Sequence, residues 1–385
     1  MRRAPSRADT SDVIVGTLRE IKNEEFRVGL TPEGAHALVD AGHEVLVERG
    51  AGAGILASDK AYCNAGAQVV GHASEVWERA DLVVKVKEPL FPEYPHIRDN
   101  QTLFTYLHLA ALPDLTRVLI DSKVTAIAYE TVQLPDGSLP LLIPMSQVAG
   151  RMATEVAAHH LRKPGPGRGK LLSGLPGAPP AHVVVLGAGI VAENAIDTAV
   201  ALGARVTVLD TRLDRLRMVE QRWPGRANTL MSSPLALASA LRRADVLICA
   251  VLVPGASAPK LVTREMVRSM GKGAVIVDVS IDQGGTCETS RATTHDEPTY
   301  VDEGVVHYCV PNMPGAVPQT STAALTAATL PYVLKLANLG TREALLRDPS
   351  LAKGVLVSEG HVTYQTLAES LGLPYVPLTE ALPPA

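Results

Sequence analysis

A glycine turn between two apolar runs is the feature that most constrains how this chain can fold. Apolar residues 183–186 lead into Gly187-Ala188-Gly189, a segment of helical length follows, and a second apolar run ends at Asp210. Gly187 permits a tight turn after a strand, and Gly189 lets the backbone come close to a ligand. The helix that follows points its free N–H groups at a bound anion. This order predicts the first unit of a dinucleotide-binding Rossmann domain.

The acidic residue at the end of the second run favours NAD over NADP. Asp210 stands about 20 residues after the glycine turn, where a carboxylate accepts hydrogen bonds from ribose hydroxyls and repels a 2′-phosphate. Two features weaken the pattern. Ala192 replaces the third glycine, and Arg212 is close enough to Asp210 to attract a 2′-phosphate.

Composition excludes several classes of partner. The chain has 385 residues, enough for two domains, and a formal net charge of −4, which offers no basic field for nucleic acid. Its apolar runs are of strand length, so we expect no membrane contact. Four cysteines without metal-ligand spacing indicate reduced thiols in a cytoplasmic protein, and we expect no metal.

The first third of the chain alternates strand-length apolar runs with helix-length amphipathic segments. Such alternation predicts a parallel α/β sheet separate from the dinucleotide unit. We therefore expect two doubly wound parallel-sheet α/β domains, the second a Rossmann domain inserted into the first. The expected divisions are a disordered extension over 1–12, a discontinuous substrate and catalytic domain over 13–140 and 316–385, and an NAD-binding domain over 141–315.

Three ionisable side chains fall where strands of the first domain are expected to end: Arg27, Lys87 and His108. Ligands of open parallel sheets bind beyond the carboxyl ends of the strands. The two cations offer charge-assisted hydrogen bonds to a carboxylate. Together the three groups predict an anionic substrate held by Arg27 and Lys87. Each group alone is more typical of a solvated surface charge or a hydrogen-bonded core histidine, and it is the coincidence of the three that favours a site.

One strand end of the second domain carries Asp282, within the segment SIDQGG. That end is expected to face the nicotinamide half of the cofactor, where Asp282 would be placed for acid–base chemistry. The alternative is a capping aspartate before two glycines. The Gly- and Pro-rich segment 163–181 is expected to be a loop, either a linker or a segment that covers the cofactor.

The chain resembles the alanine dehydrogenases through a series of segments in that family's order. They are NEEFRVGLTPEG, VVKVKEP, LFTYLHLA, AYETVQLPDG, PMSQVAGR, VVLGAGIVAENA, AVLVPGASAPKLV, SIDQGG and CVPNMPGAVPQTST. The resemblance extends from about residue 13 to about residue 360. It includes a relative of that family, the NAD-binding subunit of membrane transhydrogenase, and more remotely lysine-forming saccharopine dehydrogenase.

The resemblance implies reversible NAD-dependent oxidative deamination of L-alanine to pyruvate and ammonium, with hydride transfer in an interdomain cleft. It implies that Arg27 and Lys87 bind the substrate carboxylate and carbonyl oxygen. His108 would be the acid and base, and Asp282 would orient water or ammonia. A homohexamer, or a dimer, is also implied. The implied cofactor contacts are Ser146, Gly187, Ala188, Gly189, Ile190, Asp210, Leu252, Ile281, Asp282, Asn312 and Met313.

Three residues depart from what is common in the family: Gln147, Ala192 and Glu193. We expect these three residues to change the affinity for the cofactor and the conformation of loops, and not the class of reaction. Three other functions remain open at this stage. The chain is also compatible with the NAD(H)-binding subunit of a transhydrogenase, with a dehydrogenase of a larger amino acid, and with a non-catalytic NAD-binding sensor.

Overall fold

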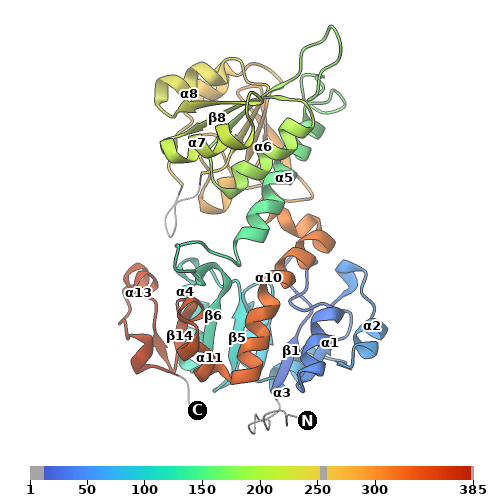
Figure 1. Cartoon of the computed structure of the whole chain (residues 1–385), viewed down its shortest axis with the longest axis vertical. Helices are drawn as coiled ribbons and strands as arrows, with labels where there is room; N and C mark the ends of the chain where they lie inside the picture. The colour runs from blue at the N-terminus through green and yellow to red at the C-terminus, as the bar shows by residue number, and fades with distance from the viewer. Residues whose placement is uncertain (1–12, 252–257, 383–385) are drawn as a thin grey trace, which may run out of the picture. The chain divides into compact units, whose positions relative to one another are not determined.

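The computed structural model describes residues 13–251 and 258–382. The chain forms two compact units, one of Met1–Pro144 with Val317–Ala385 and one of Met145–Ala316. The second unit is therefore inserted into the first, and Figure 1 shows the blue N-terminal and orange C-terminal segments in the same unit. The expected extension over 1–12 and the expected contact Leu252 lie outside the described residues.

The first unit is built on an eight-stranded sheet with strand order β15-β14-β6-β5-β4-β1-β2-β3. Strands β1 to β6 are parallel, and β14 and β15 add an antiparallel edge. The direction of winding reverses between β1 and β4, the place where such sheets bind ligands. The strands are β1 Ile14–Thr17, β2 Glu44–Glu48, β3 Gln68–Val70, β4 Leu82–Val84, β5 Thr102–Thr105, β6 Thr125–Ala128, β14 Val355–Ser358 and β15 His361–Val362.

Helices cover both faces of this sheet. Neighbouring residues of a strand point to opposite faces, and in β5 Leu103 packs in a core with Trp77 and Leu119 whereas the Phe104 ring lies 6.5 Å from Tyr332. The helices are α1 Pro32–Asp40, α2 Asp59–Asn64, α3 Ala73–Arg79, α4 Pro113–Asp121, α10 Pro318–Leu339, α11 Thr341–Arg347, α12 Pro349–Ala352 and α13 Gln365–Leu371, with short 3₁₀ helices η1 Ala53–Ile55, η2 Phe91–His96, η3 Leu109–Ala111, η4 Tyr129–Thr131 and η7 Leu378–Glu380.

The second unit has a seven-stranded sheet with order β12-β13-β11-β10-β7-β8-β9. Read from β9, its six parallel strands follow the 3-2-1-4-5-6 order of a Rossmann domain, and β12 pairs antiparallel at the edge. The reversal falls between β7 and β10. The strands are β7 His182–Leu186, β8 Arg205–Asp210, β9 Ala227–Met231, β10 Val246–Cys249, β11 Val275–Asp278, β12 Thr299–Asp302 and β13 Val305–Tyr308.

Close helix contacts in the second unit depend on small residues. A Cβ on Gly150 would lie 2.2 Å from the Val191 carbonyl oxygen, so only glycine allows α5 to approach α6 this closely. Thr154 Oγ1 donates to the Ala195 carbonyl oxygen across the same contact, at 2.9 Å. The helices are α5 Ile143–His160, α6 Ile190–Ala201, α7 Leu213–Arg222, α8 Pro234–Leu241 and α9 Arg264–Ser269, with 3₁₀ turns η5 Val279–Gln283 and η6 Met313–Ala316.

The expected fold class, two doubly wound α/β domains with the second inserted into the first, is confirmed. Five strands were not anticipated from the sequence: β3, β9, β12, β14 and β15. In the described part of the chain, no helix has both the length and the apolar character needed to cross a membrane.

Candidate active site

A buried ion cluster supports the backbone that leads to Lys87. Lys85, just past β4, is fully buried and pairs with Glu20 at 3.2 Å and Glu93 at 2.9 Å. Burial works to lower the pKa of the Lys85 ammonium, but the two carboxylates outweigh it and raise that pKa. Glu20 Oε1 also accepts the Val86 N–H at 2.6 Å and the Lys87 N–H at 3.3 Å. The cluster therefore fixes where Lys87 stands.

Arg27 lies buried in the connection from β1 to α1, held by its neighbour Glu25. Its Nε and Nη2 donate to the two carboxylate oxygens of Glu25, each at 2.6 Å. Burial acts to lower the pKa of the guanidinium, but the hydrogen-bonded ion pair with Glu25 prevails and raises it. The Arg27 guanidinium is thus held in a fixed position and stays charged, and its N–H donors lie in one plane.

The pKa of Lys87 is lowered by burial and by the positive charge of Arg27. Burial lowers the pKa of the Lys87 ammonium, and the positive charges of Arg27 and Lys22 lower it further, against the opposing effects of Glu25 and Glu88. The structure therefore brings Lys87 and Arg27 together at the winding reversal of the first sheet, where their charges repel one another. A bound carboxylate would relieve that repulsion.

His108 lies after β5, with its side chain half exposed. It adopts the left-handed conformation, with φ 49°. Its ring is parallel to that of Tyr106, with 6.0 Å between centroids and 2° between planes. The charge of Arg27 acts on the same buried Tyr106. Arg27, Lys87 and His108 therefore belong to one end of one sheet, as the sequence predicted.

Sequence reasoning missed the acids that hold these groups. Glu25, Glu20 and Glu130 all accept from the site residues or from the backbone next to them. Glu25 was visible as an acid two positions before Arg27. The others lie far along the chain from the groups they contact, so spacing could not reveal them.

In the second unit, the glycine turn is open toward a ligand. Gly187 has φ 104°, and a Cβ there would lie 2.6 Å from the Ala250 carbonyl oxygen, so glycine is required. Among the residues that the structure describes, which do not include 252–257, a Cβ on Gly189 would meet nothing within 4 Å, and no side chain caps the start of α6 there. This space in front of the helix N-terminus fits the pyrophosphate of a dinucleotide.

Asp210, at the end of β8, is also placed for the cofactor. Its Oδ2 accepts the Ala188 N–H at 2.7 Å, and its Oδ1 accepts the Arg212 N–H at 2.8 Å. Each carboxylate oxygen keeps a second lone pair for a ribose hydroxyl. The Arg212 guanidinium pairs with Asp214, at 3.2 and 2.6 Å. These contacts fit NAD.

The remaining expected cofactor contacts follow strand ends or begin helices of the second unit. Ser146 is half-buried in the first turns of α5, Ile190 begins α6, and Ile281 is buried in η5. Asn312 has φ 59° and precedes the buried Met313 of η6. Asp282 is exposed in η5. Their roles in binding and catalysis stay predictions.

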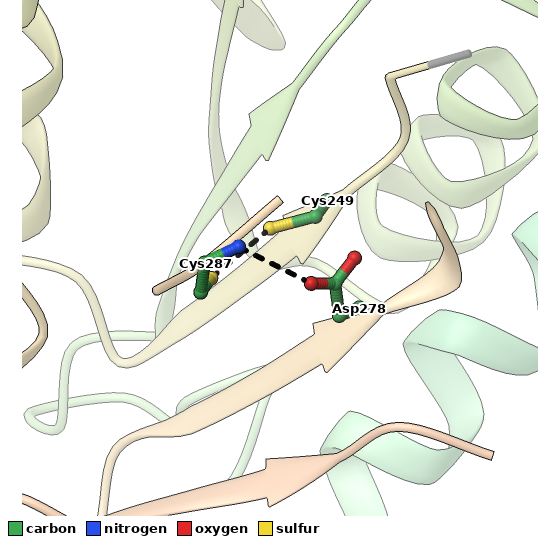
Figure 2. Close-up of side chains that lie close together, drawn as sticks. All are labelled: Cys249, Asp278 and Cys287. Carbon is green, nitrogen blue, oxygen red and sulfur yellow. Dashed lines mark hydrogen bonds between the residues drawn. The ribbon is translucent and has the colours of Figure 1, made fainter. Parts of the chain in front are cut away.

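A buried aspartate anchors the segment that carries Asp282 (Figure 2). Asp278, at the end of β11, accepts the Ser280 N–H at 3.2 Å on Oδ1. On Oδ2 it accepts the Thr286 N–H at 2.7 Å, the Ser290 hydroxyl at 2.6 Å and the Cys287 N–H at 3.4 Å. The chain from 279 to 290 is thereby folded back onto a single carboxylate.

Two thiols lie beside Asp278. The Sγ atoms of Cys249 and Cys287 are 3.8 Å apart, and with the Asp278 carboxylate they are close enough to hold a metal ion. The hydrogen bond with Cys287, and then burial, raise the pKa of the Cys249 thiol. The protein's own donors give Asp278 four hydrogen bonds, one on Oδ1 and three on Oδ2.

The fold and the site together define a class: a two-domain oxidoreductase that binds a nicotinamide dinucleotide. The chain belongs to the alanine dehydrogenase/PNT family, as the resemblance predicted. Residues 16–149 match the family model described as "Alanine dehydrogenase/PNT, N-terminal domain", and residues 153–365 match "Alanine dehydrogenase/PNT, C-terminal domain".

Individual relatives agree over nearly the whole chain. An alanine dehydrogenase of Methanococcus maripaludis is 51% identical, covering 96% of this chain and 100% of its own. One from Halomonas elongata is 54% identical, covering 93% and 96%. A solved L-alanine dehydrogenase superposes with TM-score 0.91 at 49% identity, covering 94% and 99%. A transhydrogenase from Sinorhizobium meliloti gives TM-score 0.78 at 26% identity, covering 91% and 99%.

Proposed function

We propose that this chain is an NAD-dependent L-alanine dehydrogenase. It converts L-alanine, NAD⁺ and water reversibly into pyruvate, ammonium, NADH and a proton. The observation that carries the proposal is the pair of cations, Arg27 and Lys87, at the winding reversal of the first sheet. It is supported by relatives named alanine dehydrogenase that share about half of the residues of this chain.

The first unit supplies the groups that bind the substrate. Arg27, fixed by Glu25, binds the carboxylate, and Lys87 binds the carbonyl oxygen of pyruvate. The lowered pKa of Lys87, caused first by burial, makes its proton easier to share with that oxygen. His108 gives and takes the proton that the amino and carbonyl groups exchange.

The second unit supplies the cofactor site. Gly187, Gly189 and the start of α6 hold the pyrophosphate, and Asp210 holds the ribose. NAD, when bound, accepts the hydride of the substrate α-carbon. Ser146, Ala188, Ile190, Ile281, Asn312 and Met313 complete the proposed contacts, and Asp282 orients the water or ammonia that enters the reaction.

The family resemblance also supports a cytoplasmic homohexamer. Light scattering coupled to size-exclusion chromatography tests the number of subunits. A mass of one chain, 40.7 kDa, would contradict an oligomer.

The activity is tested by following NADH absorbance with pyruvate and ammonium together and with each omitted in turn. We expect consumption only when both are present. NADH that binds but is not consumed would contradict the proposal and favour a transhydrogenase-type subunit, which exchanges hydride with a partner-bound nucleotide. The same assay with a panel of keto acids tests the substrate. A higher rate with a keto acid larger than pyruvate would make the corresponding amino acid the substrate instead of alanine.

A further inference from the structure

Glu130 contacts the backbone of His108 and faces its ring. It lies in η4, directly after β6, and β6 pairs with β5 in the sheet. Its Oε1 accepts the His108 N–H at 2.6 Å and the Leu107 N–H at 3.1 Å. One carboxylate oxygen therefore binds two successive backbone groups at the point where the chain leaves β5.

The same oxygen faces the imidazole. Glu130 Oε1 lies 3.7 Å from His108 Nδ1, within ion-pair distance, and the Glu130 side chain is only 15% exposed. The His108 ring also stacks parallel to that of Tyr106, whose hydroxyl donates to the Leu141 carbonyl oxygen at 2.6 Å. Backbone, stacking partner and carboxylate together orient the ring with Nδ1 toward Glu130, so Nε2 is the nitrogen that remains for a substrate.

We propose that Glu130 is a positioning residue that keeps a proton on Nδ1 of His108 and so presents Nε2 as the atom that exchanges a proton with the substrate. In a neutral imidazole, the hydrogen bond made by one nitrogen decides which nitrogen carries the proton. Contacts of this kind shorten when the substrate is bound. The inference rests on the proposed function, in which His108 is the acid and base.

The informative variant is Glu130→Gln. An amide oxygen can still accept the Leu107 and His108 N–H groups, so the turn is retained. The carboxylate charge beside Nδ1 is lost, and the amide N–H₂ favours an unprotonated Nδ1. Because a positioned acid–base group contributes about 10²–10⁴-fold, we expect kcat to fall at least about tenfold, with NADH affinity unchanged.

Glu75→Gln is the matched control. Glu75 Oε1 also accepts two successive backbone N–H groups, those of Gly71 and His72, at the start of α3. If the loss of a carboxylate that binds backbone N–H groups were enough to reduce kcat, both variants would lose activity. We expect Glu75→Gln to keep the kcat of the unmodified protein.

The tautomer is measured directly by ¹⁵N NMR of the full chain labelled at histidine, at alkaline pH. The His108 signals are identified by their loss in His108→Gln. We expect an Nδ1–H tautomer that moves toward Nε2–H in Glu130→Gln. An Nε2–H tautomer in the unmodified protein, or a tautomer or kcat unchanged in Glu130→Gln, would overturn the inference. Failure of the unmodified protein to consume NADH would overturn the proposed function instead, and the tautomer would still be read.

Discussion

At the residue scale, the candidate site is defined by two positive charges, Arg27 and Lys87, that are largely buried. Arg27 keeps its charge because Glu25 binds it through two hydrogen bonds, and Lys87 has a lowered pKa because burial and Arg27 disfavour its charged form. The acids near them are already engaged with protein donors. The arrangement therefore favours a ligand that brings its own negative charge and an oxygen able to accept a proton.

Replacing Lys87 by alanine removes the group proposed to contact the carbonyl oxygen. We expect turnover of pyruvate and ammonium to fall by about 10²-fold or more, with NADH binding retained because the proposed cofactor residues lie in the other unit. Steady-state rates and NADH fluorescence titration measure the two effects. Lys353→Ala is the control, because Lys353 is exposed and its ammonium donates to the Gln133 side-chain oxygen at 3.2 Å. More than a tenth of the original rate in Lys87→Ala would refute the role.

Thiol reactivity should differ sharply among the four cysteines. Cys63 is exposed, whereas Cys249, Cys287 and Cys309 are buried. Burial, followed by the charge of Asp278, raises the pKa of Cys309 to about 12, and the pKa of Cys249 is also raised. Since the thiolate is the reactive form, we expect a disulfide reagent at pH 8 to modify one thiol per folded chain and four after denaturation. Rapid modification of several thiols in the folded Cys63→Ser variant would contradict the burial of Cys249, Cys287 and Cys309.

At the element scale, local patterns were predictable and long-range contacts were not. The glycine turn, the start of α6 and the end of β8 follow from residues within one short stretch, so the Rossmann unit could be placed from sequence. β14 joins the first sheet only because it pairs with β6, more than 200 residues earlier in the chain. The four residues of β14 do not show which distant strand they will pair with.

The same reasoning explains the missed acids. Glu130 meets His108 because β5 and β6 are neighbours in the sheet, and Glu20 meets Lys87 because β1 and β4 are neighbours. The placement of Arg27, Lys87 and His108 after strands could be predicted because each follows an apolar run, and their roles stay predictions. The groups that hold them depend on strand order, which the sequence does not display.

The Asp278 anchor gives a prediction for one element, the segment 279–290. In Asp278→Ala, several buried N–H groups lose their acceptor, and bonds to a charged group contribute about 1.5–3 kcal/mol each. We expect the melting temperature to fall by several degrees, and kcat to fall because Asp282 lies in the freed segment. Calorimetry and steady-state kinetics measure both.

Asp136→Ala is the control for Asp278→Ala. Asp136 also accepts a nearby N–H and hydroxyl, both from Ser138, but it is exposed in a turn. Its replacement is expected to leave the melting temperature unchanged. An equal fall in melting temperature in the two variants would contradict the prediction that the buried Asp278 stabilises the protein more than an exposed aspartate does.

At the scale of the whole molecule, the chain uses one winding pattern twice. In each unit the first six parallel strands follow the order 3-2-1-4-5-6, so each sheet has its own reversal point and its own ligand edge. The cations and His108 follow strands of the first sheet, and the glycine turn and Asp210 follow strands of the second. The proposed substrate groups and the proposed cofactor groups thus lie in different units, each with its own core.

This separation predicts that NAD stabilises the two units unequally. Each unit holds one tryptophan: Trp77, fully buried in α3, and Trp223, which ends α7 and donates to Asp197 at 3.0 Å. Trp77→Phe therefore leaves a reporter in the second unit, and Trp223→Phe leaves one in the first. A ligand at 100 times its Kd stabilises the state that binds it by about 2.7 kcal/mol. We expect saturating NAD to raise the unfolding temperature reported by Trp223 by several degrees and that reported by Trp77 by less. An equal shift at both reporters would mean that the units unfold as one, and a shift confined to Trp77 would place the cofactor on the first unit.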